Sequence, residues 1–200
     1  MNIKNDFYDI VKLFVNQIGI TIFSLILYTS IGFIEDDTIF NTVYICLSVF
    51  ASVFYLSLLY TAAWDFGARD KIRVDGGKAS PMKWKGALYS VFANLPNFIF
   101  AIFSILFIGI YLLTSAEWAA SVGGIFVLLL RFLNTMFLGV LQSVFSFTKS
   151  HSGSLYDFCL SIGYLVMLLL PVLATHIGYT LGMREYRIFG FLRPKQQNKK

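Results

Sequence analysis

The 200-residue sequence is poor in charged side chains, which make up 14% of it, whereas a soluble domain carries about 25%. Hydrophobic residues account for 57% of the chain. A chain of this composition cannot cover its surface with polar groups, which excludes a soluble globular protein. Polar segments are also too few for the chain to stay unfolded in water. The composition therefore indicates a membrane protein, but by itself it points to no particular activity.

Cysteine and histidine are equally scarce. Cys46 and Cys159 both fall in apolar stretches, which argues against a disulfide and against a zinc site. His151 and His176 are too few and too scattered for a metal cluster. The sequence contains no H-E-x-x-H, no G-x-S-x-G and no phosphate-binding glycine loop, and no acid–base pair is visible. We therefore expect no metal, no cofactor, no catalytic residue and no enzymatic activity.

Basic residues are concentrated in three places. Fourteen of the 16 lysines and arginines lie near the N-terminus, in residues 65–86, or after residue 183. A nucleic-acid-binding protein would spread such residues over one folded polar face, so we expect no nucleic-acid partner. Here the basic residues separate long apolar runs, which is the charge distribution that a lipid bilayer imposes.

Four uncharged runs of 22 to 31 residues are long enough to cross a bilayer, for which a helix needs about 20 apolar residues. The runs do not alternate in polarity, as the strands of a β-barrel would. The sequence therefore predicts an all-α, polytopic integral membrane helical bundle, a single domain over residues 1–192. Full spans are expected at about 13–34, 39–64, 87–115 and 158–183.

A fifth hydrophobic region, residues 118–148, is divided by Arg131 into uncharged stretches of 13 and 17 residues. It either crosses the membrane once, with Arg131 near the middle, or turns near residues 131–134 and returns as a re-entrant hairpin. The positive-inside rule places the N-terminus and the basic loop 65–86 in the cytoplasm. The basic C-terminal tail lies there too only if the number of crossings is even, which requires the hairpin. Residues 193–200 are predicted to be disordered.

Several polar residues are predicted to lie within the membrane. Asn94, Pro96 and Asn97 sit inside the third span, where proline favours a kink and the two amides need hydrogen-bonding partners. Arg131, with Asn134 nearby, is the strongest candidate for a functional residue, because placing an ionised side chain within a membrane costs free energy. No acidic residue lies within a hydrophobic segment to pair with it, so Asn134, Gln142, Asn16, Gln17 and freed backbone carbonyls are its candidate partners. His176 and Pro171 lie in the last span. Structural roles, as helix contacts or as a snorkelling arginine, are the alternative for all of them.

The basic loop holds a second group of candidates. Asp65 and Arg69 are four residues apart, so on a helix they share one face and are expected to pair. With Asp70, Lys83 and Lys85 they form a candidate docking site for a phosphate head group or a partner protein. Basic residues beside a bilayer also attract anionic lipid and fix topology. In the last span, the small residues at 178 and 182 allow close helix approach.

The W-D-x-G-x-R-D pattern at residues 64–70, the N-x-P-N pattern at 94–97 and the G-Y-x-L-G pattern at 178–182 resemble those of small multi-pass bacterial membrane proteins whose activity is uncharacterised. The resemblance covers about a third of the chain. It implies a bacterial plasma membrane, and it assigns no role to any residue.

The sequence thus predicts a multi-pass plasma-membrane protein that is a non-enzymatic accessory, immunity-like or transport-associated component. Its partners would be the bilayer, with anionic head groups, and another membrane protein or a second copy of the chain. The alternative is a small transporter or channel with a polar pathway near Pro96, Arg131 and Pro171. A lipid-modifying enzyme, with Asp65 or Asp70 in a cleft, is a third possibility.

Overall fold

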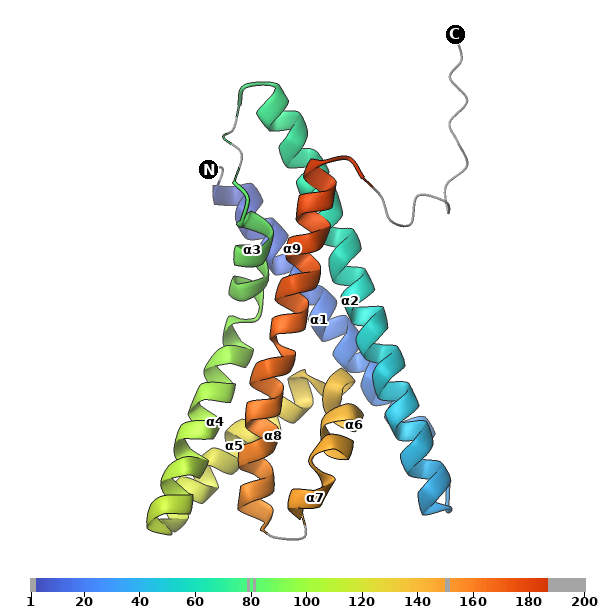
Figure 1. Ribbon diagram of the computed structural model, residues 1–200, viewed down its shortest axis with the longest axis vertical. Helices are drawn as coiled ribbons and strands as arrows, with labels where there is room; N and C mark the ends of the chain where they lie inside the picture. The colour runs from blue at the N-terminus through green and yellow to red at the C-terminus, as the bar shows by residue number, and fades with distance from the viewer. Residues whose placement is uncertain (1–2, 79, 81, 150–151, 187–200) are drawn as a thin grey trace.

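A computed structural model describes residues 3–78, 80, 82–149 and 152–186, and these residues form helices and no strand (Figure 1). Four of its helical segments are long and apolar enough to cross a membrane. The segments are α1 (Ile3–Ser30), α2 (Asp37–Asp75), α4 (Leu95–Thr114) and the pair α8 (Gly153–Met167) and α9 (Leu169–Met183). The predicted class, an all-α polytopic membrane bundle, is confirmed. The tail predicted at 193–200 lies outside the described residues.

Helix α2 continues well beyond the span expected at 39–64. It begins where the Asp36 carboxylate accepts the backbone N–H groups of Thr38 and Ile39, at 2.8 and 2.9 Å. It ends only at Asp75, because its later turns also pack on α9, where Gly67 lies against the backbone of Tyr179 and Met183 and Asp70 accepts the Tyr179 hydroxyl. The connection predicted for residues 65–86 is therefore shorter and runs from Gly76 to the start of α3 (Lys85–Ala93).

Two of the crossing segments are broken at prolines. Asn94 separates α3 from α4, and Pro96 follows in the first turn of α4. Proline has no amide hydrogen and its ring clashes with the carbonyl four residues earlier, which explains why the helix is interrupted here. Pro171 has the same effect on Met167, where α8 ends and α9 begins two residues later.

The fifth hydrophobic region forms a re-entrant hairpin. Helix α5 (Glu117–Leu133) and helix α6 (Thr135–Val144) differ in direction by 115° at Asn134. Figure 1 shows α5 starting where α4 ends, and α6 and the short α7 (Ser146–Lys149) returning to the same end, where α8 begins. Of the two alternatives, the structure has the hairpin, with its turn inside the predicted stretch 131–134.

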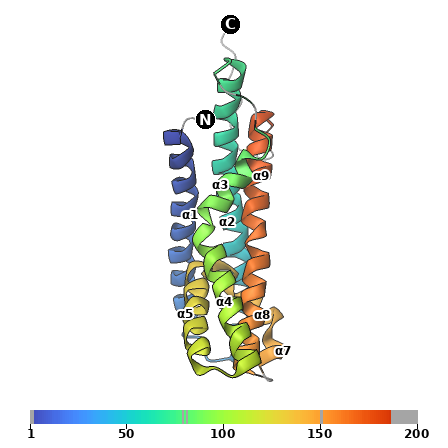
Figure 2. The same ribbon diagram turned by 90° about the vertical axis from the view of Figure 1, so that its left-hand side faces the viewer.

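The hairpin returns to the end of the molecule from which it starts, so it adds no pass along the bundle to those of the four long segments (Figure 1). The start of α1, the loop after α2 and the end of α9 consequently lie at one end of the molecule, which we call the basic end (Figure 1). The helices run along the long axis of a narrow bundle (Figure 2). They converge at the basic end and diverge at the other, where the hairpin fills the space between them (Figure 1).

Candidate functional site

A chain of buried side-chain amides connects the α3–α4 break with the tip of the hairpin. The Asn134 amide donates to the side-chain oxygen of Asn97, and the Asn97 amide donates to that of Asn94, both at 3.2 Å. Asn94 in turn donates to the Ser90 carbonyl at 2.9 Å. The three asparagines are between 0 and 2% exposed. The structure thus brings together three of the residues that the sequence singled out.

Hydroxyl and amide groups of α1 and α2 hold the tip from the opposite side. The hydroxyl of Thr21 and the amide of Gln17 donate to the Leu133 carbonyl, at 2.8 and 3.4 Å. The hydroxyls of Ser48 and Ser52 donate to the Met136 carbonyl, at 2.8 and 2.9 Å. The turn frees the Leu133 carbonyl from the helix ladder, because Leu133 is the last residue of α5, and a buried carbonyl without a partner is costly. Sequence reasoning missed Thr21 and both serines because single hydroxyls in apolar helices give no pattern.

Arg131 forms an ion pair with Asp157 of α8, with 2.5 Å between its Nη2 and a carboxylate oxygen. Its guanidinium group also lies 5.7 Å from the centre of the Tyr156 ring. The expectation that no acidic residue could reach Arg131 is therefore wrong. Asp157 stands just before the span predicted at 158–183, but α8 begins at Gly153, so the carboxylate lies within the helix. Gln17, offered as a partner for Arg131, contacts the Leu133 carbonyl instead.

Neutralising Arg131 alone is expected to destabilise the protein more than neutralising the pair. Arg131→Met leaves the Asp157 carboxylate without its cation, and both side chains are about two-thirds buried. We expect a loss of about 2 kcal/mol, below the range for a fully buried pair. Adding Asp157→Asn should recover at least half of it. The measurement is unfolding in mixed micelles, and equal losses for the single and double variants would contradict the pairing.

Several buried polar atoms around the hairpin have no hydrogen-bond partner among the described residues. They are Gln17 Oε1, Asn134 Oδ1, Arg131 Nε and the Tyr164 hydroxyl. Tyr164 follows Asp157 by seven residues and so lies on the same face of α8. Buried polar groups are normally satisfied, and an unsatisfied one needs a water, an ion or a bound molecule. These hydrogen-bond donors and acceptors around the hairpin are therefore available to bind a water, an ion or a small polar solute.

A second polar group, the ionic cluster of the basic end, joins four helices. Lys85 of α3 contacts the carboxylates of Asp70 and Asp6, at 2.7 and 3.0 Å. The hydroxyl of Tyr179, on α9, donates to Asp70 at 3.0 Å, and that of Tyr89 donates to Asp6. Burial would lower the pKa of the Lys85 ammonium, but its two hydrogen-bonded carboxylates outweigh this and raise the pKa.

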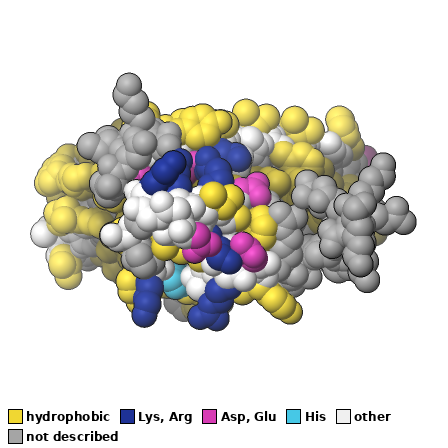
Figure 3. Space-filling model, turned by 90° about the horizontal axis from the view of Figure 1, so that it is seen from above, with side chains coloured by type: hydrophobic (Ala, Val, Ile, Leu, Met, Phe, Trp, Pro, Cys, Tyr) yellow, Lys and Arg dark blue, Asp and Glu magenta, His cyan; other side chains and the backbone are white. Residues whose placement is uncertain are grey.

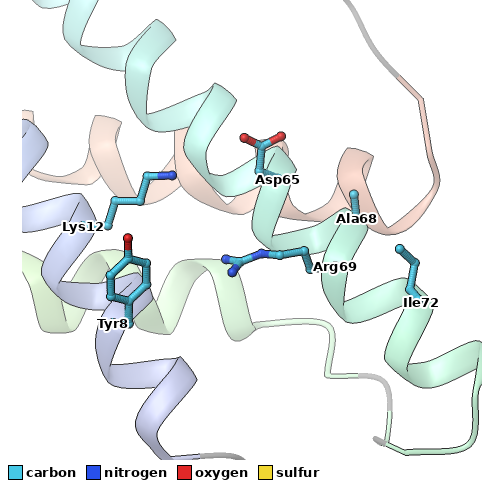
Figure 4. A pocket seen from close by; sticks show the side chains of 6 residues that line it. All are labelled: Tyr8, Lys12, Asp65, Ala68, Arg69 and Ile72. Atoms are coloured by element: carbon cyan, nitrogen blue, oxygen red, sulfur yellow. The ribbon is translucent and has the colours of Figure 1, made fainter.

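The predicted pair between Asp65 and Arg69 does not form. Arg69 contacts Asp9 of α1 instead, at 2.6 Å, because α1 packs beside this stretch of α2. Asp65 and Arg69 line an open cavity of about 430 Å³, shown in Figure 4, together with Tyr8, Lys12, Ala68 and Ile72. Asp6 and Asp9 were missed as partners, although their spacing of three puts them on one helix face.

The remaining candidates, Lys83 and His176, belong to neither group. They line a different cavity at the basic end, where His176 stacks on Trp84, and Tyr179 of the ionic cluster lines the same cavity. The structure therefore brings one candidate from the last span and one from the basic loop to the same cavity. The sequence did not predict that they would lie together. The hydrogen bonds of the asparagine chain in the described residues do not involve His176.

The fold and these polar groups define a polytopic helical membrane protein. Its re-entrant hairpin is held by hydrogen bonds, with its tip about half-way along the bundle (Figure 1). Comparisons with protein-family models, with curated proteins and with solved structures found no match to this chain. The resemblance to small bacterial membrane proteins therefore stays a prediction.

Proposed function

We propose that this protein is a small, non-enzymatic transporter or channel in which the hairpin tip lines the pathway of a polar solute. The observation that carries the proposal is the re-entrant hairpin, which brings Asn134 and Arg131 to mid-height beside unpartnered polar atoms. Within a bilayer, non-helical backbone is tolerated only inside protein or along a water-filled cavity. Transporters use such helix breaks, near the middle of the membrane, to bind their substrates.

We further propose that the basic end faces the cytoplasm of a bacterial cell and that the protein lies in the plasma membrane. Apart from Arg131, the lysines and arginines whose side chains the structure describes gather toward that end (Figure 3). Short loops rich in lysine and arginine stay in the cytoplasm, and an even number of crossings puts the N-terminus, the basic loop and the end of α9 on that side.

The test of the pathway is the access of water-soluble reagents to the hairpin tip. Cys46 and Cys159 are first replaced by serine, and Asn134→Cys is then introduced. We expect a small charged thiol reagent to label this cysteine in membranes at least ten times faster than Ile108→Cys, a control that is 3% exposed in apolar packing. Gln17→Cys, on the α1 side of the tip, provides a second reporter.

A second candidate is a non-enzymatic accessory component that acts through a membrane-protein partner or a second copy. It is favoured by the closed packing of the asparagine chain, whose members hydrogen-bond to one another and are almost fully buried. If the tip serves only as structure, Asn134→Cys and Gln17→Cys will react as slowly as Ile108→Cys. That result would contradict the transport proposal and leave the accessory role.

A further inference from the structure

The basic end holds a cavity of about 380 Å³ between the residues before α3 and the last turns of α9. The Trp84 ring forms one wall by stacking on the His176 imidazole, with ring centres 4.9 Å apart and planes 11° from parallel. The other lining residues are Met82, Lys83, Tyr179, Thr180, Met183 and Arg184.

The close packing of α3 on α9 builds this cavity. Gly86 lies so near α9 that a Cβ there would meet the Thr175 carbonyl oxygen at 2.9 Å and overlap the Tyr179 side chain. Tyr179 is 2% exposed and held by its hydrogen bond to Asp70. This packing fixes the start of α3, with Trp84 directly before it, against the part of α9 that holds His176.

The cations of this cavity, like Lys12 and Lys78, differ from four other cations of the basic end that form ion pairs. Arg69, Lys71, Arg73 and Lys85 each contact a carboxylate, at 2.6 to 3.4 Å. Within the described part of the chain, no ion pair involves Lys83 or Arg184, and no acidic residue lines the cavity. Glu185, next to Arg184, is engaged by Lys71 at 2.9 Å. Among the described residues, no acidic side chain therefore balances the positive charges of Lys83 and Arg184 in this cavity.

The same cavity has an apolar, exposed edge. Trp84 is 66% exposed and Met82 is 46% exposed. Seen from above, some lysine and arginine side chains lie near the middle of the basic end, and others project at its rim, beside the histidine and next to hydrophobic side chains (Figure 3). Tryptophan favours the level of the head groups in a membrane. At the level of the head groups, the cations of the cavity match a phosphate, and its apolar edge matches an acyl chain of the same molecule.

We propose that this cavity binds the head-group phosphate of an anionic phospholipid. Lys83 and Arg184 supply the positive charge for the phosphate, and Trp84 with Met82 contacts the adjoining chains. The open cavity beside Asp65 is unsuited to this ligand, because the Asp65 carboxylate and the Arg69–Asp9 pair offset its positive charge. The proposal goes beyond the transport function and does not depend on it.

The test is native mass spectrometry of the full chain in detergent, titrated with phosphatidylglycerol or with phosphatidylcholine. The key variant combines Lys83→Gln with Arg184→Gln, both of which are exposed side chains. The matched control combines Lys12→Gln with Lys78→Gln, which removes the same charge outside the cavity. Because a basic residue near a membrane surface contributes about fivefold to the binding of anionic lipid, we expect the key variant to bind phosphatidylglycerol about 25-fold more weakly. The control should stay within about threefold of the wild type.

Equal losses in the key variant and in the control would overturn the proposal, since the attraction would then depend on net charge alone. Equal binding of both lipids by the wild-type protein would also overturn it. A third arm adds inorganic phosphate at millimolar concentration. If free phosphate displaces phosphatidylglycerol from the wild type, the site takes the free anion and the lipid proposal is wrong, whereas undiminished lipid binding supports it.

Discussion

Replacing Gly182 by alanine is expected to lower the free energy of unfolding by about 3 kcal/mol, the upper part of the usual range for overpacking. A Cβ at this position would overlap the Trp64 carbonyl oxygen and lie 3.0 Å from the Ala68 nitrogen. These are backbone atoms of α2, which cannot rotate away. Gly178, one turn earlier, meets the Tyr60 carbonyl oxygen in the same way at 2.5 Å. The two small residues thus let α9 pack directly on α2, as their spacing predicts.

Gly124→Ala is the matched control for this prediction. Gly124 also lies within a helix, but a Cβ there would have nothing within 4 Å. Alanine is the better helix former, by about 1 kcal/mol, so this variant should be neutral or slightly stabilised. Both variants are compared by reversible unfolding in mixed micelles followed by circular dichroism. A loss for Gly182→Ala no larger than that of the control would show that α2 and α9 do not pack this closely.

Lys85→Met is expected to cost about 3 kcal/mol, the lower end of the range for removing one member of a buried ion pair. Its side chain is 15% exposed, and it is the cation shared by Asp70 and Asp6, whose side chains are 12 and 10% exposed. Without Lys85, both carboxylates keep hydroxyl donors but lose their main positive neighbour. The ends of α1, α2 and α3 should separate more easily.

The control is Lys83→Met, which changes the same residue type two positions earlier, where the side chain is exposed and no ion pair is found in the described chain. Its unfolding free energy should change by less than about 0.5 kcal/mol. In the Lys85→Met background, Asp70→Asn should restore stability, whereas in the wild type it should reduce it. If Asp70→Asn is equally harmful in both backgrounds, Lys85 and Asp70 do not interact.

Much of the architecture follows from simple patterns along the chain. Uncharged runs predicted the four long segments, Pro96 marked the break before α4, and the positive-inside rule, applied to the basic C-terminal region, favoured the hairpin. The hairpin was one of two alternatives, because a run of 31 residues with one arginine fits either a single span or a turn. The helix direction changes at Asn134, within the stretch that the hairpin alternative named.

The partners of the charged residues did not follow from the sequence. Arg69 has a suitable neighbour at Asp65 four residues earlier, yet the packing of α1 on α2 brings Asp9 closer. Arg131 and Asp157 are 26 residues apart, and only the return of α6 and α7 to the start of α8 brings them together. Patterns of three or four residues describe one helix and cannot report which helix lies opposite.

The sequence by itself determined that this protein is a helical bundle for a lipid environment, because the cost of placing charge in hydrocarbon acts on each segment separately. Only the tertiary structure decided which polar groups meet: the asparagine chain at the hairpin tip, the carboxylates around Lys85, and the cations beside Trp84. Those contacts depend on distances between helices, and such distances are set by packing across the whole molecule.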